Sequence, residues 1–253
     1  MTTILGDSIQ PDPTLGSVLA TVLLHPQASF HHLVVFGAGL QANAHVRQLL
    51  ATYPHIARIT IVNRQTSARL SALVDDLSRA YPAVACEGLS SASRAPTEAA
   101  VRSADIICCV TPSTAPLFPS EWVRPDTHVI LVGSYTPAMA EVDTALIKRA
   151  RVVLVDSRGA CAEEAGELIA AGVPQARMVE VGELLRSTEV PGEKSWGWEP
   201  DAQRVAEVLA AGTGDITIFK SVGIGAQDVA IAVATVERAT EMGIGTVVPG
   251  FDA

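Results

Sequence analysis

Hydrophobic residues gather in short, nearly continuous runs from residue 32 onward, and longer segments with helical spacing separate these runs. Such runs are typical of buried parallel strands, and the spacing between them is typical of helices that cover a sheet. The predicted strands span 33–36, 58–62, 106–110, 128–132, 151–155 and 216–219, with a short addition around 83–88. The intervening helices span 41–53, 66–81, 96–103 and 143–149. This alternation predicts an α/β fold with a doubly wound parallel sheet.

The two ends of the chain depart from this alternation. Near the start, loop-like residues surround a single predicted helix over 15–24. After Asp156, helical spacing recurs over 160–171, 178–185, 201–211 and 229–242. Residues 190–200 contain proline, glycine and two tryptophans, which indicates an exposed excursion. We therefore expect the regular sheet to occupy the middle of the chain.

The first predicted strand leads directly into the sequence Gly37-Ala-Gly-Leu-Gln-Ala42, a G-x-G-x-x-A pattern that opens a predicted helix. Gly37 permits a sharp turn, Gly39 lets the backbone approach a phosphate, and Ala42 permits close packing of helix on strand. The helix N-terminus adds unpaired N–H groups and a positive dipole. The pattern predicts the pyrophosphate site of a Rossmann-type fold, although glycines also mark ordinary turns.

Composition narrows the classes of partner. The net charge of −9 and the absence of a lysine and arginine cluster argue against nucleic acid. No apolar stretch reaches the length of a membrane span, and the first residues lack the pattern of a signal peptide, so we expect a cytoplasmic protein that does not bind membranes. The four cysteines have no zinc spacing, and we expect no metal site.

The end of the second predicted strand favours a particular dinucleotide. An acidic residue there would bind the adenosine ribose diol, whereas a basic residue would accept a 2′-phosphate. The sequence at this position is Asn63-Arg64-Gln65-Thr66, without a carboxylate. We therefore predict NADPH in preference to NADH as the cofactor. The alternative is that Asn63 forms a turn and Arg64 is a solvated charge.

The loops after the predicted strands 106–110 and 128–132 carry hydroxyl groups. Thr111 follows one strand and Ser134 follows the other. Because ligands bind at the carboxyl ends of strands in an open parallel sheet, both loops would border the nicotinamide half of the cofactor. The alternative is that both are simple turns that lead into Pro112 and Pro137.

Several segments together resemble the ornithine cyclodeaminase and mu-crystallin family. In order along the chain, they are Gly37–Ala42, Val62–Arg64, Ala104–Ile106 with Val110–Thr111, Glu121–Val123, Val132–Gly133 with Pro137, Glu141–Asp143, Val155–Ser157, Glu164–Glu167, and Phe219–Gly223 with Asp228. The resemblance extends from about residue 30 to 245. It implies a dinucleotide-binding enzyme, in a family that includes cyclodeaminases, alanine dehydrogenases and ketimine reductases.

The resemblance also implies roles for individual residues. The pyrophosphate would be held by Gly37, Ala38, Gly39, Leu40 and Gln41, the adenosine phosphate by Asn63, Arg64 and Thr66, and the nicotinamide side by Thr111, Val132, Gly133 and Ser221. Glu164 falls where the mu-crystallin branch has a carboxylate close to its ligand. The Asn-Arg pair resembles the NADPH-using mu-crystallin branch more than the cyclodeaminases.

One departure concerns the chemistry. Cyclodeaminases of this family carry a catalytic aspartate after the fifth strand, and Tyr135 stands at that position here. A carboxylate can accept a proton or activate water, whereas a tyrosine hydroxyl, with an ordinary pKa of about 10, can donate a proton to an imine nitrogen. We take Tyr135 as the catalytic candidate, with a loop aromatic packed under the cofactor as the alternative.

A second departure concerns the start of the chain. Family members carry a substrate and dimer domain before the nucleotide fold, and most of it has no counterpart here. We expect residues 1–30 to be a remnant of that domain, 31–215 to form the dinucleotide-binding domain, and 216–253 to form a C-terminal strand and helix that would return to the substrate domain. The helix face formed by Val229, Ile231, Ala232 and Val236 would then be exposed. A shortened gene model, binding without catalysis, and completion by another subunit all stay open.

These observations predict an NADPH-dependent oxidoreductase that reduces an imine or ketimine of a small, amino-acid-like molecule. Two alternatives are a non-catalytic protein that binds NADPH or a small ligand, and a lyase of the ornithine cyclodeaminase type. A homodimer is one assembly consistent with the resemblance.

Overall fold

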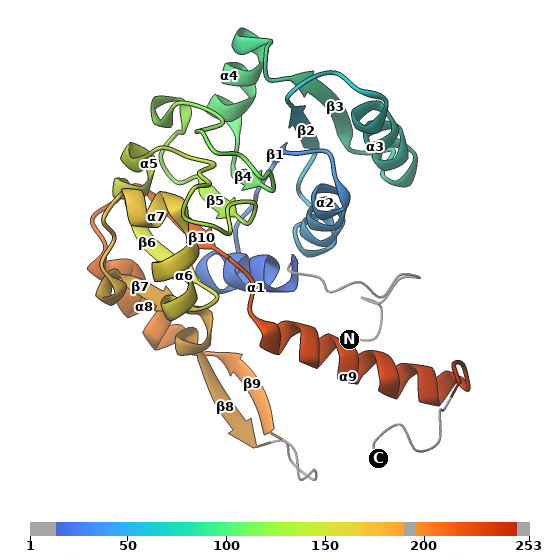
Figure 1. Cartoon of the computed structure of the whole chain (residues 1–253), viewed down its shortest axis with the longest axis vertical. Coiled ribbons are helices and arrows are strands. Elements are labelled where there is room, and N and C mark those ends of the chain that lie inside the picture. The colour runs from blue at the N-terminus through green and yellow to red at the C-terminus, as the bar shows by residue number, and fades with distance from the viewer. Residues whose placement is uncertain (1–13, 190–195, 247–253) are drawn as a thin grey trace.

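The computed structural model describes residues 14–189 and 196–246. Its centre is an eight-stranded parallel sheet with the order β3-β2-β1-β4-β5-β10-β6-β7 (Figure 1). The strands are β1 (His32–Phe36), β2 (Arg58–Asn63), β3 (Ala85–Ser90), β4 (Ile106–Cys109), β5 (His128–Leu131), β6 (Ala150–Val155), β7 (Met178–Glu180) and β10 (Ile216–Lys220). This is the predicted Rossmann-type doubly wound sheet, with β10 inserted between β5 and β6.

Helices cover both faces of the sheet. They are α1 (Thr14–Leu24), α2 (Leu40–Thr52), α3 (Ala68–Ala80), α4 (Arg94–Ser103), α5 (Thr144–Lys148), α6 (Arg158–Glu164), α7 (Gly166–Ala170) and α8 (Ala202–Ala211), whereas a further helix, α9 (Gly225–Met242), lies away from the sheet. Alternate residues of β1 enter different cores, because Leu33 and Val35 pack with α1, α2 and α3, whereas Val34 and Phe36 pack with α4, α5 and α7. Burial on both faces explains why the strands are continuous apolar runs.

Two predicted helices differ in the structure. The segment 178–185, predicted as a helix, instead forms β7 and a 3-10 turn over Val181–Leu184, because β7 pairs with β6 and completes the edge of the sheet. The segment 160–171 is divided into α6 and α7 at Gly166. A Cβ atom at Gly166 would lie 2.0 Å from the carbonyl oxygen of Met139, so only glycine permits this approach.

Residues 190–195 lie outside the described residues, and the rest of the predicted excursion over 190–200 belongs to a β-hairpin that begins earlier, at Leu185. Its strands are β8 (Leu185–Glu189) and β9 (Trp196–Pro200), which pair in an antiparallel sheet of their own. The hairpin extends away from the main body (Figure 1), and Trp198 is exposed.

Helix α1 packs on the sheet through pairs of histidine and hydroxyl groups. Ser17 Oγ lies 2.9 Å from His45 Nε2 on α2, and Thr21 Oγ1 lies 3.1 Å from His128 Nε2 on β5. Residues 1–30 were expected to be a remnant of a separate domain. Within them, α1 packs against α2 and β5 of the nucleotide fold. Residues 1–13, the rest of that expectation, lie outside the described residues.

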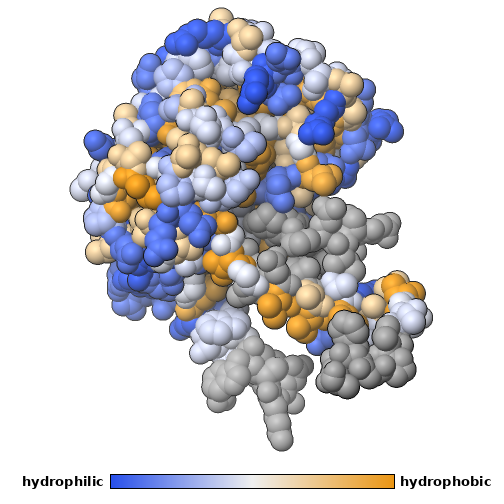
Figure 2. Space-filling view, viewed as in Figure 1, coloured by the Kyte–Doolittle hydropathy of each residue, from blue (hydrophilic) through white to orange (hydrophobic). Residues whose placement is uncertain are grey.

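Helix α9 extends from the body with few contacts (Figure 1). Its apolar residues are visible along the helix in Figure 2, and Val229, Val233 and Val236 are all more than half exposed. Exposure of Val229, Ala232 and Val236 agrees with the expectation, and the side chain of Ile231 lies outside the description. Within the described residues, every helix is too short or too polar to span a bilayer.

Candidate functional site

The glycine turn after β1 forms one wall of a cleft at the carboxyl ends of the strands. Gly37 has a φ of +120°, which favours glycine, and its N–H donates to the carbonyl of Val62 at 2.9 Å. Gly39 precedes α2 in an extended conformation, and no side chain caps the helix. The backbone N–H groups of the first turn of α2 are therefore suited to an anion, as the sequence predicted.

The first part of the cleft has a volume of about 660 Å³ and lies beside this turn. Its lining residues are Phe36, Gly37, Ala38, Gly39, Val62, Asn63, Arg64, Gln65, Ser67, Arg69, Ser91, Val110, Thr111, Pro112, Ser113 and Leu117. The lining contains two arginines and no carboxylate. Most of the glycine-loop residues, Asn63, Arg64 and Thr111 thus come together as predicted, whereas Leu40 and Thr66 are exposed outside this lining.

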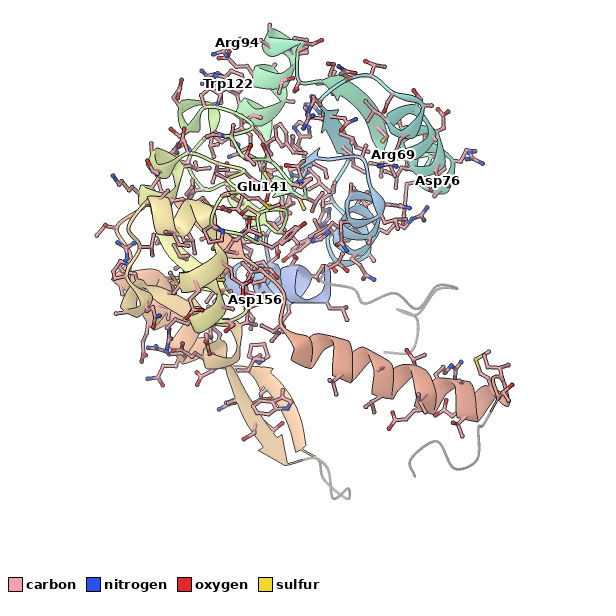
Figure 3. The ribbon with its side chains drawn as sticks, in the orientation of Figure 1. Arg69, Asp76, Arg94, Trp122, Glu141 and Asp156 are labelled. Atoms are coloured by element: carbon pink, nitrogen blue, oxygen red, sulfur yellow. The ribbon has the colours of Figure 1, made fainter. Side chains whose placement is uncertain are left out.

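Two residues of this lining were missed by the sequence reasoning. Ser67 caps α3 by accepting a hydrogen bond from the Leu70 N–H, and Arg69 lies in the first turn of the same helix (Figure 3). Arg64 and Arg69 are exposed, and among the described residues neither guanidinium has an ion-pair partner. The available signal was an arginine five positions after Arg64, at the expected start of a helix.

The second part of the cleft has a volume of about 380 Å³ and shares Val110 and Pro112 with the first. Its lining is Gln41, Val110, Pro112, Val132, Gly133, Tyr135, Ser221, Val222 and Gly223. Tyr135 is 50% exposed and is the one titratable side chain in this lining. The oxygen Oε1 of Gln41 is buried without a hydrogen-bond partner among the described residues.

Glu141 joins the loops after β4 and β5 from beneath the cleft (Figure 3). Its Oε1 accepts hydrogen bonds from the backbone N–H of Thr111 at 2.7 Å and from the Thr111 hydroxyl at 3.0 Å. Its Oε2 accepts from the N–H of Gly133 at 2.8 Å. Burial raises the pKa of Glu141 to about 7, although these backbone hydrogen bonds and the Lys220 charge act in the opposite direction.

Asp156 holds the segment after β10 in a similar way (Figure 3). Its Oδ2 accepts hydrogen bonds from the Ser221 hydroxyl at 2.7 Å, the Val222 N–H at 3.0 Å and the Gly223 N–H at 2.8 Å. Ser221 was expected to line the nicotinamide side. It does line the cleft, but its hydroxyl is directed to Asp156.

Ser134 occupies a different place from the one expected. It is fully buried, its hydroxyl donates to Glu167 Oε2, and Lys220 Nζ donates to both its hydroxyl and its carbonyl oxygen. Lys220 Nζ also lies 3.2 Å from Glu167 Oε1, and both side chains are fully buried. Ser134 is therefore part of the support of the loop and not of the cleft surface, because its side chain points away from the cleft.

Glu164, the residue expected beside a substrate, ends α6 and is exposed outside both linings. The structure does not bring it together with Tyr135 in the cleft. Its predicted contact with a substrate stays a prediction.

The cleft fits a dinucleotide on several grounds. The glycine turn lets a ligand approach the start of α2, the two arginines can accept an anion at one end, and the unpartnered Gln41 oxygen can accept a hydrogen bond near the other.

The model of the ornithine cyclodeaminase/mu-crystallin family matches residues 16–243. The chain belongs to this family.

Relatives within the ornithine cyclodeaminase/mu-crystallin family include named reductases. The chain is 34% identical over 222 residues to a Delta(1)-pyrroline-2-carboxylate reductase of Colwellia psychrerythraea, covering 88% of this chain and 63% of the relative. It is 29% identical over 217 residues to the mouse ketimine reductase mu-crystallin, covering 85% of this chain and 58% of the relative. The chain thus spans less than two thirds of the length of these relatives.

Solved structures of this family have the same fold. A Thermococcus litoralis Delta(1)-pyrroline-2-carboxylate reductase in complex with NADH and L-proline superposes with a TM-score of 0.72 at 22% identity, covering 93% of this chain and 66% of that one. A probable ornithine cyclodeaminase from Bordetella pertussis gives 0.68 at 26% identity, covering 92% of this chain and 67% of that one. These similarities agree with the Rossmann-type architecture described above.

Proposed function

We propose that this chain binds a nicotinamide dinucleotide, with NADPH preferred over NADH, and that it acts in the reduction of a small imine. The observation that carries the cofactor preference is the lining of the first part of the cleft, where, within the part of the chain that the structure describes, Arg64 and Arg69 have no ion-pair partner and no carboxylate is present. A ribose 2′-phosphate would supply the missing charge, because guanidinium groups bind phosphate with several N–H donors.

The proposed orientation follows the shape of the cleft. The pyrophosphate lies over Gly37 and Gly39 at the start of α2, and the adenosine half extends toward Arg64. The nicotinamide ring then occupies the second part of the cleft, beside Val132 and Gly133. Gln41, with its unpartnered oxygen, is suited to a polar group on that ring.

The proposed reaction transfers a hydride to the carbon of a C=N bond and a proton to its nitrogen, giving an amine. The reduced cofactor supplies the hydride when bound. Tyr135 would donate the proton from its hydroxyl and regain one from water. The named activities of the relatives, reduction of pyrroline-2-carboxylate and of ketimines, support a substrate class of small imines that carry a carboxylate.

The cofactor preference is tested with Arg64→Ala. We expect NADPH affinity to fall by about tenfold and NADH affinity to stay nearly constant, because only NADPH carries the phosphate. Calorimetric titration with both nucleotides measures this. Arg79→Ala is the matched control, since Arg79 is an exposed arginine on the neighbouring α3 outside the cleft lining. Equal losses for both nucleotides would contradict the phosphate assignment, and the absence of binding to either would contradict the cofactor proposal.

The chemical role of Tyr135 is tested with Tyr135→Phe. Loss of general acid catalysis lowers kcat for pyrroline-2-carboxylate reduction by about a hundredfold, and NADPH affinity is retained because the ring is preserved. Steady-state assays and calorimetry on the same preparations separate the two effects. An unchanged kcat would remove Tyr135 as the proton donor.

A second candidate function is binding without turnover. It is favoured by the second part of the cleft, where Tyr135 is the one titratable residue of the lining. The same scarcity argues against a lyase of the cyclodeaminase type, because no carboxylate among the described residues lines this part of the cleft to accept a proton or activate water. Tight NADPH binding with no imine reduction under any tested condition would favour the binding function.

A further inference from the structure

The carboxylate of Glu141 connects two loops that line different parts of the cleft. Thr111, which it holds through two hydrogen bonds, lines the first part, and Gly133, which it holds through one, lines the second. Glu141 itself is fully buried and belongs to neither lining. It therefore lies behind the place where the two parts of the cleft meet.

The two loops approach so closely that there is no space for a side chain at Gly133. A Cβ atom at Gly133 would lie 2.1 Å from the carbonyl oxygen of Thr111 and 2.5 Å from Glu141 Oε1. The backbone segments are thus separated by less than the width of a methyl group. Three N–H and O–H groups converge on one carboxylate at this contact, and loss of that acceptor would leave partly buried donors unpaired.

We propose that Glu141 is a positioning residue of the cofactor site, and that its ionised carboxylate holds the Thr111 and Gly133 loops at the separation that a bound dinucleotide requires. This inference rests on the proposed cofactor binding. It differs from the role of Arg64, because Thr111 and Gly133 follow β4 and β5, whereas the 2′-phosphate that distinguishes NADPH from NADH is proposed to lie beside Arg64 after β2. Glu141 therefore affects both nucleotides equally.

We call the three hydrogen bonds from Thr111 and Gly133 to Glu141 the clamp, and the charges around Glu141 make this clamp sensitive to pH. Lys220 on β10 favours the ionised form, whereas Glu167 on α7 and burial favour the protonated form. The thiols of Cys108 and Cys109, which lie on opposite faces of β4, interact electrostatically with Glu141 and stay protonated, because burial raises their pKa well above the ordinary value. With a Glu141 pKa of about 7, the carboxylate is ionised at pH 8 and protonated at pH 6. When Glu141 is protonated, its own O–H would face the N–H and O–H donors of Thr111 and Gly133, and it could accept fewer hydrogen bonds from them.

The decisive experiment measures the affinity for NADH and NADPH in wild type and in Glu141→Gln. At pH 8 we expect the variant to bind both nucleotides about tenfold more weakly, because a side-chain amide cannot accept all three hydrogen bonds. Glu98→Gln, which changes a carboxylate on the surface of α4, is the control with unchanged affinity. Arg64→Ala serves as the contrast, since it affects NADPH alone.

The pH dependence of NADH affinity adds a second measurement, because a role of Glu141 in stability alone would not make the affinity change with pH. We expect the NADH affinity of wild type to fall by about tenfold from pH 8 to pH 6, as for a group with a pKa near 7, and that of Glu141→Gln to be flat. NADH is used because it lacks a 2′-phosphate that titrates in this range. Hydrogen exchange of the Thr111 and Gly133 amides in the unliganded protein reports on the clamp directly, and we expect it to be faster in the variant.

The outcomes separate this inference from the proposed function. Wild-type affinity and an unchanged pH profile in Glu141→Gln would overturn the inference while cofactor binding stands. A wild type that binds neither nucleotide would overturn both the proposed function and the positioning role, even if the amides lose protection in the variant. If Glu141→Gln does not fold, Thr111→Val removes the hydroxyl bond alone, and an unchanged affinity for NADH in that variant would count against the clamp.

Discussion

Ser134 and Tyr135 are neighbours in one loop, yet their environments are opposite. Ser134 is fully buried against Glu167 and Lys220, whereas half of Tyr135 is exposed at the cleft. The same division recurs elsewhere in the site. Arg64 is exposed in the lining of the cleft, and buried Glu141 holds the backbone of two loops in place. These polar residues therefore either line the cleft or support the loops that line it.

The buried ion pair between Lys220 and Glu167, which supports the loop that contains Ser134, predicts a large loss of stability when one of the two charged residues is replaced. In Lys220→Met, Glu167 would stay buried without its counter-charge, so we expect the free energy of unfolding to fall by about 3–5 kcal/mol. Urea unfolding measures this. The control is Arg186→Ala, which breaks an ion pair with Glu199 on the exposed hairpin and should cost at most about 1 kcal/mol. A loss in Lys220→Met as small as in the control would mean that Glu167 is not dependent on this lysine.

The sequence could predict the residues that line the cleft better than the residues that support its loops. Gly37, Asn63 and Arg64 belong to a local strand, turn and helix pattern, so their place at the cleft can be inferred from their neighbours. Glu141 and Glu167 contact partners that are distant along the chain, such as Thr111 and Lys220. Their positions belong to segments of the family resemblance, but the hydrogen bonds exist only once the sheet brings those segments together.

At the scale of elements, strands were more predictable than the segments after β6. Continuous apolar runs located β1, β2, β4, β5 and β6 to within one or two residues of their ends. β7 has a helical pattern of apolar residues, and its pairing with β6 determined its conformation instead. The insertion of β10 between β5 and β6 depends on contacts across the whole sheet, and local patterns do not contain that order.

The attachment of α1 to the sheet predicts sensitivity to acid. Thr217 Oγ1 on β10 lies 2.8 Å from both His25 Nε2, just after α1, and His128 Nδ1 on β5. Burial lowers the pKa of His25 to about 4, and burial together with the charge of His25 lowers the pKa of His128 well below its ordinary value. The unfolded chain therefore binds protons that the folded chain excludes between pH 6.5 and about 4.

Because the pKa values of His25 and His128 are lowered in the folded protein, the free energy of unfolding decreases as the pH falls. The variant His25→Gln isolates the contribution of His25. We expect wild type to lose about 2 kcal/mol more free energy of unfolding between pH 7 and pH 5 than His25→Gln does. The comparison between variants is needed because the raised pKa of Glu141 acts in the opposite direction over the same range. His55→Gln, at an exposed histidine, should behave as wild type. Parallel pH dependence in His25→Gln and wild type would show that His25 is accessible to protons in the folded protein.

At the scale of the whole molecule, the cleft and the exposed helix are joined by a short segment. Asp156 fixes Ser221, Val222 and Gly223 at the cleft, and α9 begins at Gly225. Beyond that point the helix leaves the body, and its valines face solvent (Figure 2). Among the side chains that the structure describes, none from α9 belongs to the cores on the two faces of the sheet, so we expect the fold that builds the cleft to depend little on contacts with that helix.

This separation predicts that the apolar residues of α9 contribute little to the stability of the body. Replacement of Val229, Val233 and Val236 together by glutamine should change the free energy of unfolding by about 0.5 kcal/mol or less, because exposed substitutions remove no packed contacts. Leu49→Ala in buried α2 should cost about 2–5 kcal/mol under the same conditions. Urea unfolding at low protein concentration measures both. A loss near 2 kcal/mol in the triple variant would show that α9 packs against the body in solution, and the independence of the cleft from this helix would then be wrong.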